Sequence, residues 1–394
     1  MKRRIKHFFG GIKGAFIVIF VFLLFPFARL FLWHKKIWIV SEHGYEARDN
    51  GYSFFKYMRK EHPEANCYYA IDFDSSDYPK IKELGNPIKF GSFKHFAYWC
   101  AARYIISSKT QGFCPSYYLT LLRKKMHLWG KYVFLQHGIT KDDQKFLYKK
   151  PSKIDLFICG AKPEYDDIKA HYGYKENEVA YTGFARFDDY FGLTPKNQIL
   201  VMPTWRRYAE NVKFEETEYF KTWYSFINSE ELNTILKNSG VMLFFYMHPQ
   251  FKQYSHLFKT NCSNIKVIPF ENNDLQVLIR ESQLFITDFS SLAFDFGYMK
   301  RPVIYYQYDE EDYFKGHYIK GYFDYRRDGF GPVLMNFSDV VKQINNTIDN
   351  KFKVYDKYLD NHNKFFVLCD NGNSKRIFDA ILFLSNRNLN TKRE

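Results

Sequence analysis

The sequence lacks the cysteine pairs and the short motifs that identify several common classes of protein. Its six cysteines are scattered and none forms a CxxC pair, which argues against a disulfide framework or a zinc site and indicates a reducing compartment. There is also no GxxxxGK loop followed by Ser or Thr, no GxGxxG, no HExxH and no GxSxG. These absences exclude the enzyme classes that such motifs define.

Acidic residues are missing from the start of the chain. An apolar run extends from Ala15 to Phe25 and continues to Trp33 with only Arg29 charged. The basic residues before the first acid, Glu42, are Lys2, Arg3, Arg4, Lys6, Lys13, Arg29, Lys35 and Lys36. Lys and Arg beside an apolar segment are typical of contact with anionic lipid headgroups.

Three structures fit this first segment. A cleaved signal peptide would need a small-residue cleavage site, and none follows. A spanning helix is possible by length, but the run carries Pro26 and Arg29, and its basic flanks give no clear topology. A single span would also export the rest of the chain. We therefore expect residues 1–36 to be a membrane-associating segment that lies in the interface on the cytoplasmic face, so that the protein is peripheral or N-terminally anchored.

Composition narrows the remaining classes. The chain has 394 residues and is 20% aromatic, so disorder is excluded and two ordinary α/β domains fit its length. The formal net charge is +14, which raises the question of nucleic acid. Because the basic excess gathers at the membrane-like end and no nucleic-acid-binding motif is present, we expect no nucleic-acid partner.

After the first segment, short apolar runs alternate with helical stretches around residues 53–62 and 94–103. Continuous rather than alternating hydrophobicity is typical of parallel strands that are covered on both faces. The runs expected to be strands in the first half are Ile37–Val40, Cys67–Ile71, Tyr104–Ile106, Tyr132–Leu135, Leu156–Cys159 and Val179–Tyr181.

The pattern restarts after a stretch rich in Gly, Thr, Pro and Asn at Phe191–Asn197. We place the domain boundary there, with domains at 37–194 and 195–394. The fold class is α/β, with two doubly wound, Rossmann-like domains facing a cleft. The strands expected in the second half are Ile199–Met202, Val241–Tyr246, Ile265–Ile268, Leu284–Ile286 and Val303–Tyr306.

The most informative segment follows the run Leu284–Ile286. A polar turn with Ser290 leads into a short helix that Pro302 ends, and Ser290 is a good N-cap. The free N–H groups of a first helical turn, together with the helix dipole, form an anion site. Because the segment lies at the carboxyl end of a predicted strand, we interpret it as a cradle for a diphosphate.

Polar residues follow four other predicted strands, which suggests one shared crevice. His137 can be a general base, or a loop-end histidine whose hydrogen bonds are satisfied; Gly138 after it would let the backbone turn and expose the ring. His248 can be a base or a donor to phosphate oxygens. The candidate substrate-binding residues are Arg186, Thr204, Arg206, Thr287, Asp288, Ser290, Ser291 and Asp295.

Each of these candidates has a plainer alternative. Arg186 and Arg206 can clamp phosphates through the planar guanidinium, or lie on the surface. Serines at helix starts are common, and Asp288 and Asp295 can be structural or face a ribose. Asp72-Phe73-Asp74 resembles the DxD that holds a divalent metal in some sugar transferases, but a strand-end loop explains this common pattern better, and we expect no metal site.

Taken together, these segments resemble the CDP-glycerol glycerophosphotransferase family, the teichoic-acid polyol-phosphate primases and polymerases. The resemblance covers residues 100–335 and is tightest over Ile286–Asp309. The motifs that carry it, in the family's order, are His137-Gly138, Gly183…Arg186, Pro203-Thr204-Trp205-Arg206, His248-Pro249, Thr287-Asp288-Phe289-Ser290-Ser291, Gly321-Tyr322-Phe323-Asp324 and Gly329-Phe330-Gly331-Pro332. The segment Glu46–Gly51 also looks like the start of such a chain.

The resemblance implies a GT-B-like fold with the nucleotide held mainly by the C-terminal domain. It implies transfer of glycerol phosphate or ribitol phosphate from CDP-glycerol or CDP-ribitol to a hydroxyl of a lipid-linked polymer acceptor, with CMP leaving. Because a helix N-terminus with Arg, His and Ser donors can neutralise charge in phosphoryl transfer, we expect no further cofactor. His137 would be the base. His248, Arg206, Ser290 and Ser291 would stabilise the donor diphosphate.

One departure from the family concerns the acceptor side. The family often has Trp before its His-Gly and a Lys shortly after it, whereas Gln136 stands here and Lys141 is the candidate for the Lys. Two other functions remain open. A GT-B transferase could use a nucleotide sugar, and a membrane scaffold could keep the fold without the activity.

Overall fold

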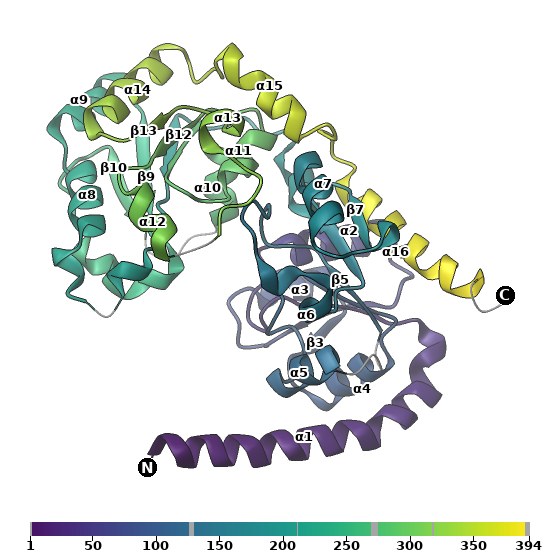
Figure 1. Ribbon diagram of the computed structural model, residues 1–394. Helices are drawn as coiled ribbons and strands as arrows, with labels where there is room; N and C mark the ends of the chain where they lie inside the picture. Colours follow the sequence, from purple (N-terminus) through teal and green to yellow (C-terminus); the bar gives the residue numbers. More distant parts are fainter. Residues whose placement is uncertain (1, 126–129, 211, 269–274, 317–318, 391–394) are drawn as a thin grey trace. The chain divides into compact units, whose positions relative to one another are not determined.

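The chain forms two compact units, each built on its own parallel β-sheet (Figure 1). The computed structural model describes residues 2–125, 130–210, 212–268, 275–316 and 319–390. The first unit consists of residues 1–137, 145–189 and 370–394, and the second of residues 138–144 and 190–369. The predicted α/β class, with two parallel-sheet domains, is confirmed.

The first sheet has seven strands in the order β3-β2-β1-β4-β5-β6-β7, and neighbouring strands are parallel. Its strands are β1 (Trp38–Val40), β2 (Cys67–Ile71), β3 (Pro87–Lys89), β4 (Tyr104–Ser107), β5 (Lys131–Phe134), β6 (Leu156–Cys159) and β7 (Val179–Tyr181). Its helices after α1 are α2 (Asn50–Glu61), α3 (Tyr78–Leu84), α4 (Phe93–Ala101), α5 (Tyr117–Lys125), α6 (Lys149–Ser152), α7 (Lys162–His171) and α16 (Asn373–Asn390).

The second sheet has six parallel strands in the order β10-β9-β8-β11-β12-β13. Its strands are β8 (Gln198–Val201), β9 (Met242–Tyr246), β10 (Ile265–Ile268), β11 (Leu284–Thr287), β12 (Val303–Tyr306) and β13 (Val333–Leu334). Its helices are α8 (Glu218–Ile227), α9 (Glu230–Ser239), α10 (Leu275–Glu281), α11 (Ala293–Tyr298), α12 (Glu310–Gly316), α13 (Tyr325–Asp328), α14 (Phe337–Asp349) and α15 (Asp356–Phe365).

Both sheets reverse their strand order at one point. The first reverses between β1 and β4, and the second between β8 and β11. Chains leaving the carboxyl ends of the two strands at such a point diverge, and open α/β sheets bind their ligands in the crevice that results. These two reversal points are therefore where each unit is expected to carry its functional side chains.

Two edge strands, β3 and β13, were not predicted. They have three and two residues, and in β13 both residues are only half-buried. Too few side chains enter the core to give the apolar run that marks the other strands. The longer runs were predicted well because their side chains are buried on both faces, as in β6 and β11.

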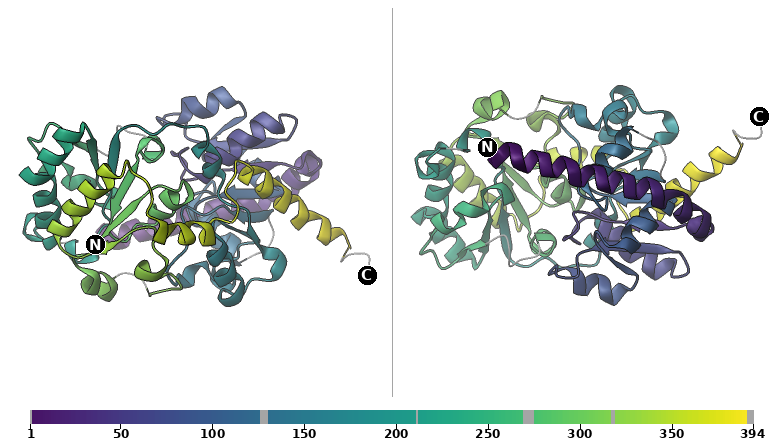
Figure 2. Two further views of the ribbon diagram at one scale, coloured as in Figure 1. Left: turned by 90° about the horizontal axis from the view of Figure 1, so that it is seen from above. Right: turned by 90° about the horizontal axis from the view of Figure 1, so that it is seen from below.

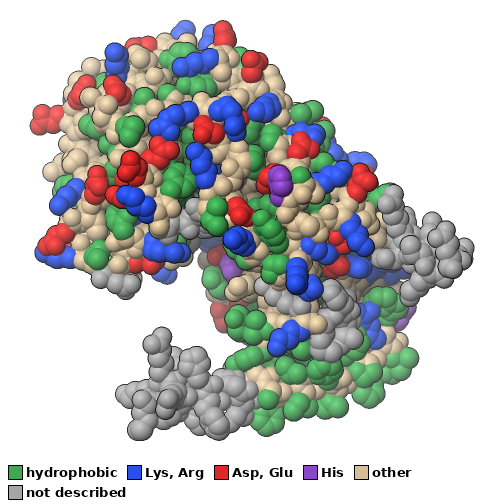
Figure 3. Space-filling view, in the orientation of Figure 1, with side chains coloured by type: hydrophobic (Ala, Val, Ile, Leu, Met, Phe, Trp, Pro, Cys, Tyr) green, Lys and Arg blue, Asp and Glu red, His purple; other side chains and the backbone are tan. Residues whose placement is uncertain are grey.

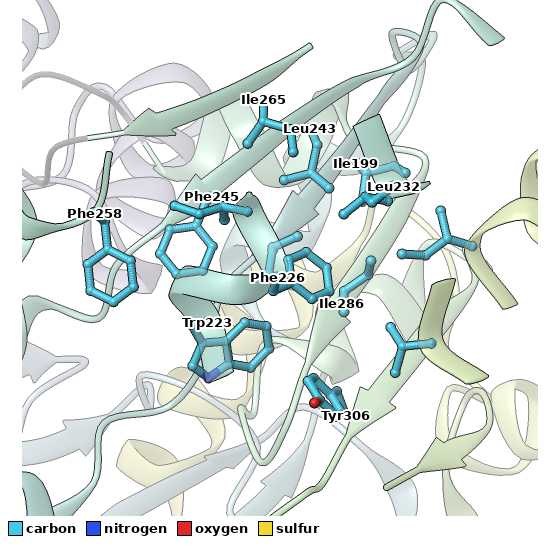
Figure 4. Close-up of a cluster of buried hydrophobic side chains, with 14 of the residues drawn as sticks. Ile199, Trp223, Phe226, Leu232, Leu243, Phe245, Phe258, Ile265, Ile286 and Tyr306 are labelled. Atoms are coloured by element: carbon cyan, nitrogen blue, oxygen red, sulfur yellow. The ribbon is translucent and has the colours of Figure 1, made fainter. Parts of the chain in front are cut away.

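The core of the second unit is rich in aromatic side chains (Figure 4). Trp223 of α8 packs against Phe226 of the same helix and Phe245 of β9, and the ring of Tyr306 lies edge-on to Trp223. Buried aromatic pairs in this geometry add to the stabilisation that burial alone supplies. This packing fixes the sheet beneath the reversal point.

The first helix, α1 (Lys2–Leu32), is 31 residues long and continues through Pro26. One of its stripes packs on the first unit, where Val21 and Ala28 are buried in the core with residues of α4. The ring of Phe20 also lies edge-on to Phe96 of α4. Side chains seven residues apart share one face of a helix, so α1 lies lengthwise along α4.

The opposite stripe of α1 is apolar and uncovered. Phe16, Leu23 and Leu30 are 70%, 66% and 74% exposed. Figure 2 shows α1 in front in the view from below, and hydrophobic side chains gather along it in Figure 3. Among the described residues, one helical segment, Gly14–Lys35, is long and apolar enough to cross a membrane by length and composition.

The unit boundaries differ from the expected division at residue 194. The last segment of the chain, with α16, belongs to the first unit, and residues 138–144 belong to the second. Asp188 connects the start of α16 to the first unit. Its carboxylate accepts the backbone N–H of Asn373 at 2.9 Å and that of Ser374 at 2.8 Å. Composition alone gave no sign of this return.

Candidate active site

Polar side chains follow β1 and β4, the two strands at the reversal point of the first sheet, and β5, the strand beside β4. Glu42 follows β1, Lys109 follows β4 and His137 follows β5. The fold therefore brings the predicted His137 to the place where parallel sheets bind ligands.

Asp49 joins this group from the start of α2, where it is the N-cap. It is buried, and its Oδ2 forms a short hydrogen bond with Nδ1 of His137, whose side chain is 72% exposed. An ionised carboxylate only accepts, so Nδ1 carries the proton and Nε2 is left as the acceptor. An exposed imidazole held in this tautomer can take a proton from a hydroxyl group.

Opposite charges keep Asp49 ionised. Burial would raise the pKa of its carboxyl, but the neighbouring His137, Lys109 and Arg186 outweigh burial and hold that pKa well below its usual range. Lys109 Nζ lies 3.4 Å from Asp49 Oδ2 and 3.1 Å from His137 Nδ1, and Arg186 Nη1 lies 3.2 Å from Asp49 Oδ1. The carboxylate therefore stays charged and keeps His137 in one orientation.

Glu42 supports the turn that presents Asp49. It is fully buried and accepts the backbone N–H groups of Arg48, Asp49 and Tyr52 at 3.1–3.2 Å. Burial, together with the charge of Asp49, raises the pKa of Glu42 to about 8. Asp49 is thus held by both its side chain and its own backbone.

Arg186 and Asn50 fix the backbone around His137. Arg186 Nη1 donates to the carbonyl of His137 at 2.9 Å, and Asn50 Nδ2 donates to the carbonyl of Gln136 at 2.7 Å. The N–H of Arg186 donates to Asn50 Oδ1 at 3.1 Å. Arg186, expected to bind the donor, is buried in the first unit, where its side chain contacts Asp49 and His137.

The left-handed turn at the end of β5 falls on Gln136, not on Gly138. Gln136 has a φ of 59°, whereas Gly138 has no positive φ. What Gly138 provides is room, because a Cβ there would lie 2.8 Å from Oγ of Ser291. The expectation that Gly138 supplies the sharp turn is therefore corrected.

The reversal point of the second sheet is organised around Arg206, which is fully buried. Its Nε and Nη2 donate to the two oxygens of Asp309 at 2.7 and 2.8 Å, and Nη2 lies 2.8 Å from Oδ2 of Asp288. Nη1 donates to the carbonyl of Thr204 at 2.7 Å. The two carboxylates outweigh burial and raise the pKa of Arg206 well above its usual value.

These contacts change the role expected for Arg206. A guanidinium with no exposed surface and with its fork engaged on two carboxylates is not presented to a phosphate. Asp288 is fully buried too, and its Oδ1 accepts the N–H of Thr204 at 2.8 Å. In the structure both side chains contact the loop after β8, which for Asp288 is the structural alternative that the sequence left open.

Two further candidates are buried and bonded inside the second unit. Thr287 donates its hydroxyl to the carbonyl of Met202 at 2.7 Å, and the carboxylate of Asp295 accepts from the hydroxyl of Tyr190. The half-buried candidates are Thr204, His248, Ser290 and Ser291. Of the residues predicted in the second unit, these four retain surface for a ligand.

Ser290 does not cap a helix as expected. Helix α11 begins at Ala293, and the Oγ of Ser290 accepts the N–H of Leu292 at 3.2 Å in a turn before it. The N–H groups of residues 293, 294 and 295 donate to the carbonyls of residues 290, 291 and 292. The first-turn donors predicted to be free are therefore used inside the turn.

His248 follows β9, the strand beside β8. Its Nδ1 accepts the N–H of Gln250 at 3.2 Å, which leaves Nε2 as the atom that carries the proton. In this tautomer, Nε2 is a hydrogen-bond donor. His248 thus has the form suited to a phosphate oxygen, one of its two predicted roles.

The Asp72-Phe73-Asp74 sequence forms a strand-end turn. Oδ1 of Asp72 accepts the N–H of Asp74 at 3.2 Å, and the ring of Phe73 stacks on Tyr78. Among the described residues, no group of three or more His, Cys, Asp or Glu side chains is placed to hold a metal ion.

Sequence reasoning missed Asp49, Glu42 and Lys109 as members of the site. The signal for Asp49 was its place before a helical segment inside Glu46–Gly51, which had been noted only as a resemblance. Nothing in the spacing links it to His137, which is 88 residues away. The contact exists because α2 follows β1 and β5 lies two strands from β1.

Comparison with known proteins identifies a family and several relatives of teichoic acid biosynthesis. The family model described as CDP-Glycerol:Poly(glycerophosphate) glycerophosphotransferase matches residues 23–383. The minor teichoic acid biosynthesis protein GgaB of Bacillus subtilis is 34% identical over 367 residues, covering 89% of this chain and 40% of GgaB. A teichoic acid poly(glycerol phosphate) polymerase of Staphylococcus epidermidis is 22% identical, covering 88% of this chain and 50% of that protein. The chain thus spans half or less of the length of these relatives.

Solved structures agree on the fold. The wall teichoic acid polymerase TagF matches with a TM-score of 0.65 at 17% identity, covering 97% of this chain and 99% of that one. The MnaA–UDP structure of S. aureus matches with a TM-score of 0.56 at 12% identity, covering 89% and 97%. At these identities the matches establish the GT-B-like architecture of two Rossmann-like domains.

Proposed function

The chain belongs to the CDP-glycerol:poly(glycerophosphate) glycerophosphotransferase family, and on that premise we propose that it transfers a polyol phosphate from a CDP-polyol to a hydroxyl of a teichoic-acid-type acceptor. The observation that carries the proposal is the exposed imidazole of His137, held by the buried carboxylate of Asp49 at the reversal point of the first sheet.

In this reaction His137 acts as the general base. The acceptor hydroxyl attacks the phosphorus that carries the polyol, and its proton passes to Nε2 of His137. The bond between that phosphorus and the oxygen bridging to CMP breaks, and CMP leaves. Asp49 stabilises the imidazolium that forms, because its carboxylate stays ionised beside it. Phosphoryl transfer depends mainly on such positioning and on neutralisation of charge.

The donor side belongs to the second unit in this proposal. Thr204, His248, Ser290 and Ser291 are the predicted residues with accessible surface at carboxyl ends of its sheet. Their hydroxyl groups and the Nε2–H of His248 would donate to the diphosphate of the donor. Arg206, Asp288 and Asp309 would hold the loop after β8 in place beneath it.

CDP-glycerol is the donor that the family description favours, with CDP-ribitol as the alternative. A teichoic acid poly(ribitol-phosphate) polymerase of Bacillus spizizenii is 25% identical to this chain over 224 residues. The donor screen below therefore includes both.

We also propose that α1 lies in the membrane interface and keeps the site near a lipid-linked acceptor. One stripe of α1 is used by α4, which leaves only the outer stripe for lipid. Arg29 points inward, donating from Nε to the carbonyl of Cys100 at 3.0 Å and lying 4.1 Å from the ring of Trp33. A helix that packs lengthwise on a folded domain fits an in-plane position better than a span.

The test of the reaction is a donor screen with the purified chain and a lipid-linked acceptor. We expect CMP release from CDP-glycerol or CDP-ribitol, and none from UDP-sugars. Turnover of nucleotide sugars alone would replace the proposal with glycosyl transfer. No turnover of any donor, with no loss of cellular polymer in a His137→Ala strain, would support the scaffold.

The test of the anchor is sedimentation with vesicles that contain phosphatidylglycerol. Replacing Phe16, Leu23 and Leu30 by Ser should release most of the protein, whereas Val367→Ser, an exposed apolar residue of the second unit, should not. Extraction by high salt or alkali is expected for an in-plane helix. Resistance to both treatments would indicate a span.

A further inference from the structure

The residue before His137 is held in a backbone conformation that its type rarely adopts. Gln136 is buried and has a φ of 59°, in the left-handed region that non-glycine residues avoid. Such conformations persist where surrounding contacts determine them, and they gather at functional sites.

The side-chain amide of Gln136 is fastened to two elements. Its Nε2 donates to the carbonyl of Ile158 in β6 at 2.7 Å and to Oε1 of Glu164 in α7 at 2.9 Å. Its backbone carbonyl accepts from Asn50 in α2 at 2.7 Å. One residue at the end of β5 is thus bonded to a neighbouring strand and to two helices.

Glu164 is itself held by hydrogen bonds at both carboxylate oxygens. It is fully buried, and its Oε2 accepts the N–H groups of Gly160 and Ala161 at 2.8 and 3.4 Å, at the start of α7. Its other oxygen is the one that meets Gln136. A carboxylate fixed at both oxygens provides a rigid anchor for the amide.

We propose that Gln136 and Glu164 form a positioning pair, which locks the left-handed turn after β5 so that His137 projects toward solvent with Nδ1 on Asp49. Neither residue touches substrate in this account. The pair acts through the backbone of His137, whose carbonyl is held from the other side by Arg186. The catalytic part of the inference rests on the proposed function, but the orientation of His137 does not.

Two substitutions separate the amide from the backbone. Gln136→Ala removes the amide and leaves a side chain in the left-handed region. Gln136→Gly also removes the amide but tolerates that region. If the amide orients His137, both variants should lower kcat about 10-fold or more while the Kd for CDP-glycerol stays within about twofold, as a loss of positioning predicts.

The matched control is Gln198→Ala in the second unit. Gln198 is also buried, and its Nε2 donates to Oγ of Ser282 at 3.1 Å, at the beginning of β8. It lies at the end of its strand opposite to the reversal point. Gln198→Ala should lower the thermal midpoint about as much as Gln136→Ala does, but it should not change kcat.

The decisive readout needs no turnover. The ¹⁵N chemical shifts of His137, assigned with the His137→Ala variant, report which ring nitrogen carries the proton. We expect Nδ1–H in the wild type and a mixture of tautomers in Gln136→Ala and Gln136→Gly. An unchanged single tautomer in both variants would overturn the proposal, even if the full chain transferred nothing from CDP-glycerol. If the tautomer mixes while the wild type is inactive on every donor, the positioning stands and the proposed function fails.

Discussion

The first six strands of each unit have the same order, but the two units arrange their charged side chains differently around the reversal point. In the first unit, a buried carboxylate supports an imidazole whose side chain is 72% exposed. In the second, Arg206, Asp288 and Asp309 form a network with almost no exposed surface. In the first unit the buried charge of Asp49 orients an exposed imidazole that can react. In the second unit the buried charges pair with one another and hold a loop in place.

The same topology therefore does not fix which reversal point carries the reactive group. The difference lies in which side chain is exposed to solvent beside the buried charged residues. In the first unit this is His137, beyond Asp49. In the second it is the polar surface of Thr204, Ser290 and Ser291, beyond Arg206 and Asp288. The first unit would thus supply the base and the second the donor contacts.

The largest effect should come from the exposed member of the first network. His137→Ala should lower CMP release by about 10²- to 10⁴-fold, the range that general bases supply, without unfolding the chain. His171 is the matched control, since it is also exposed and lies 2.8 Å from a carboxylate, that of Asp167. His171→Ala should keep full activity. Equal losses in both variants would show that the loss does not depend on the contact between His137 and Asp49.

The second effect should appear as stability, not as chemistry. Arg206→Met leaves two buried carboxylates without their partner, which costs about 3–5 kcal/mol and lowers the thermal midpoint by about 10 °C. Arg326→Met removes an exposed ion pair with Glu310 and should change the midpoint little. Calorimetry of both variants checks this. A stable Arg206→Met chain that has lost only donor binding would return Arg206 to the role of a direct ligand.

The smallest effect concerns a buried imidazole of the first unit that has no part in the site. His95 accepts the N–H of Gly91 at 3.1 Å, and burial lowers the pKa of its ring to about 3. Between about pH 6.5 and pH 3 the unfolded chain binds this proton and the folded chain does not, so the free energy of unfolding falls as the pH drops.

His95→Asn keeps an acceptor for the Gly91 N–H and removes the titrating ring. Between pH 7 and pH 5 the wild type should lose about 2 kcal/mol more stability than this variant, because each unit below 6.5 contributes about 1.4 kcal/mol. Urea unfolding at the two pH values measures the difference. Parallel losses would show that His95 does not carry this pH dependence.

The sequence predicted those elements of the fold whose pattern lies within a few consecutive residues. Runs such as Leu156–Cys159 and Leu284–Ile286 are apolar at every position because both faces of the strand are covered, so they could be recognised one by one. The edge strand β13, with two half-buried residues, has no such pattern. The return of α16 to the first unit depends on Asp188 meeting residues far along the chain, which no local pattern records.

The site was predictable by position more than by role. His137, Arg206 and Ser290 all lie at strand ends, as expected. A strand end does not reveal whether Arg206 meets a phosphate or two carboxylates, since Asp309 is 103 residues away. Nor does it reveal that Gln136, a departure from the resemblance, takes a left-handed turn that depends on Glu164 in another element.

The central claim is that Asp49 holds His137 as the base, and Asp49→Asn tests it most directly. An Asn that donates to Nδ1 would move the ring proton to Nε2 and remove the acceptor, while the shape of the side chain is kept. We predict that CMP release from CDP-glycerol falls about 10²-fold or more while binding of CDP-glycerol is unchanged. Release at the wild-type rate in Asp49→Asn would contradict the account.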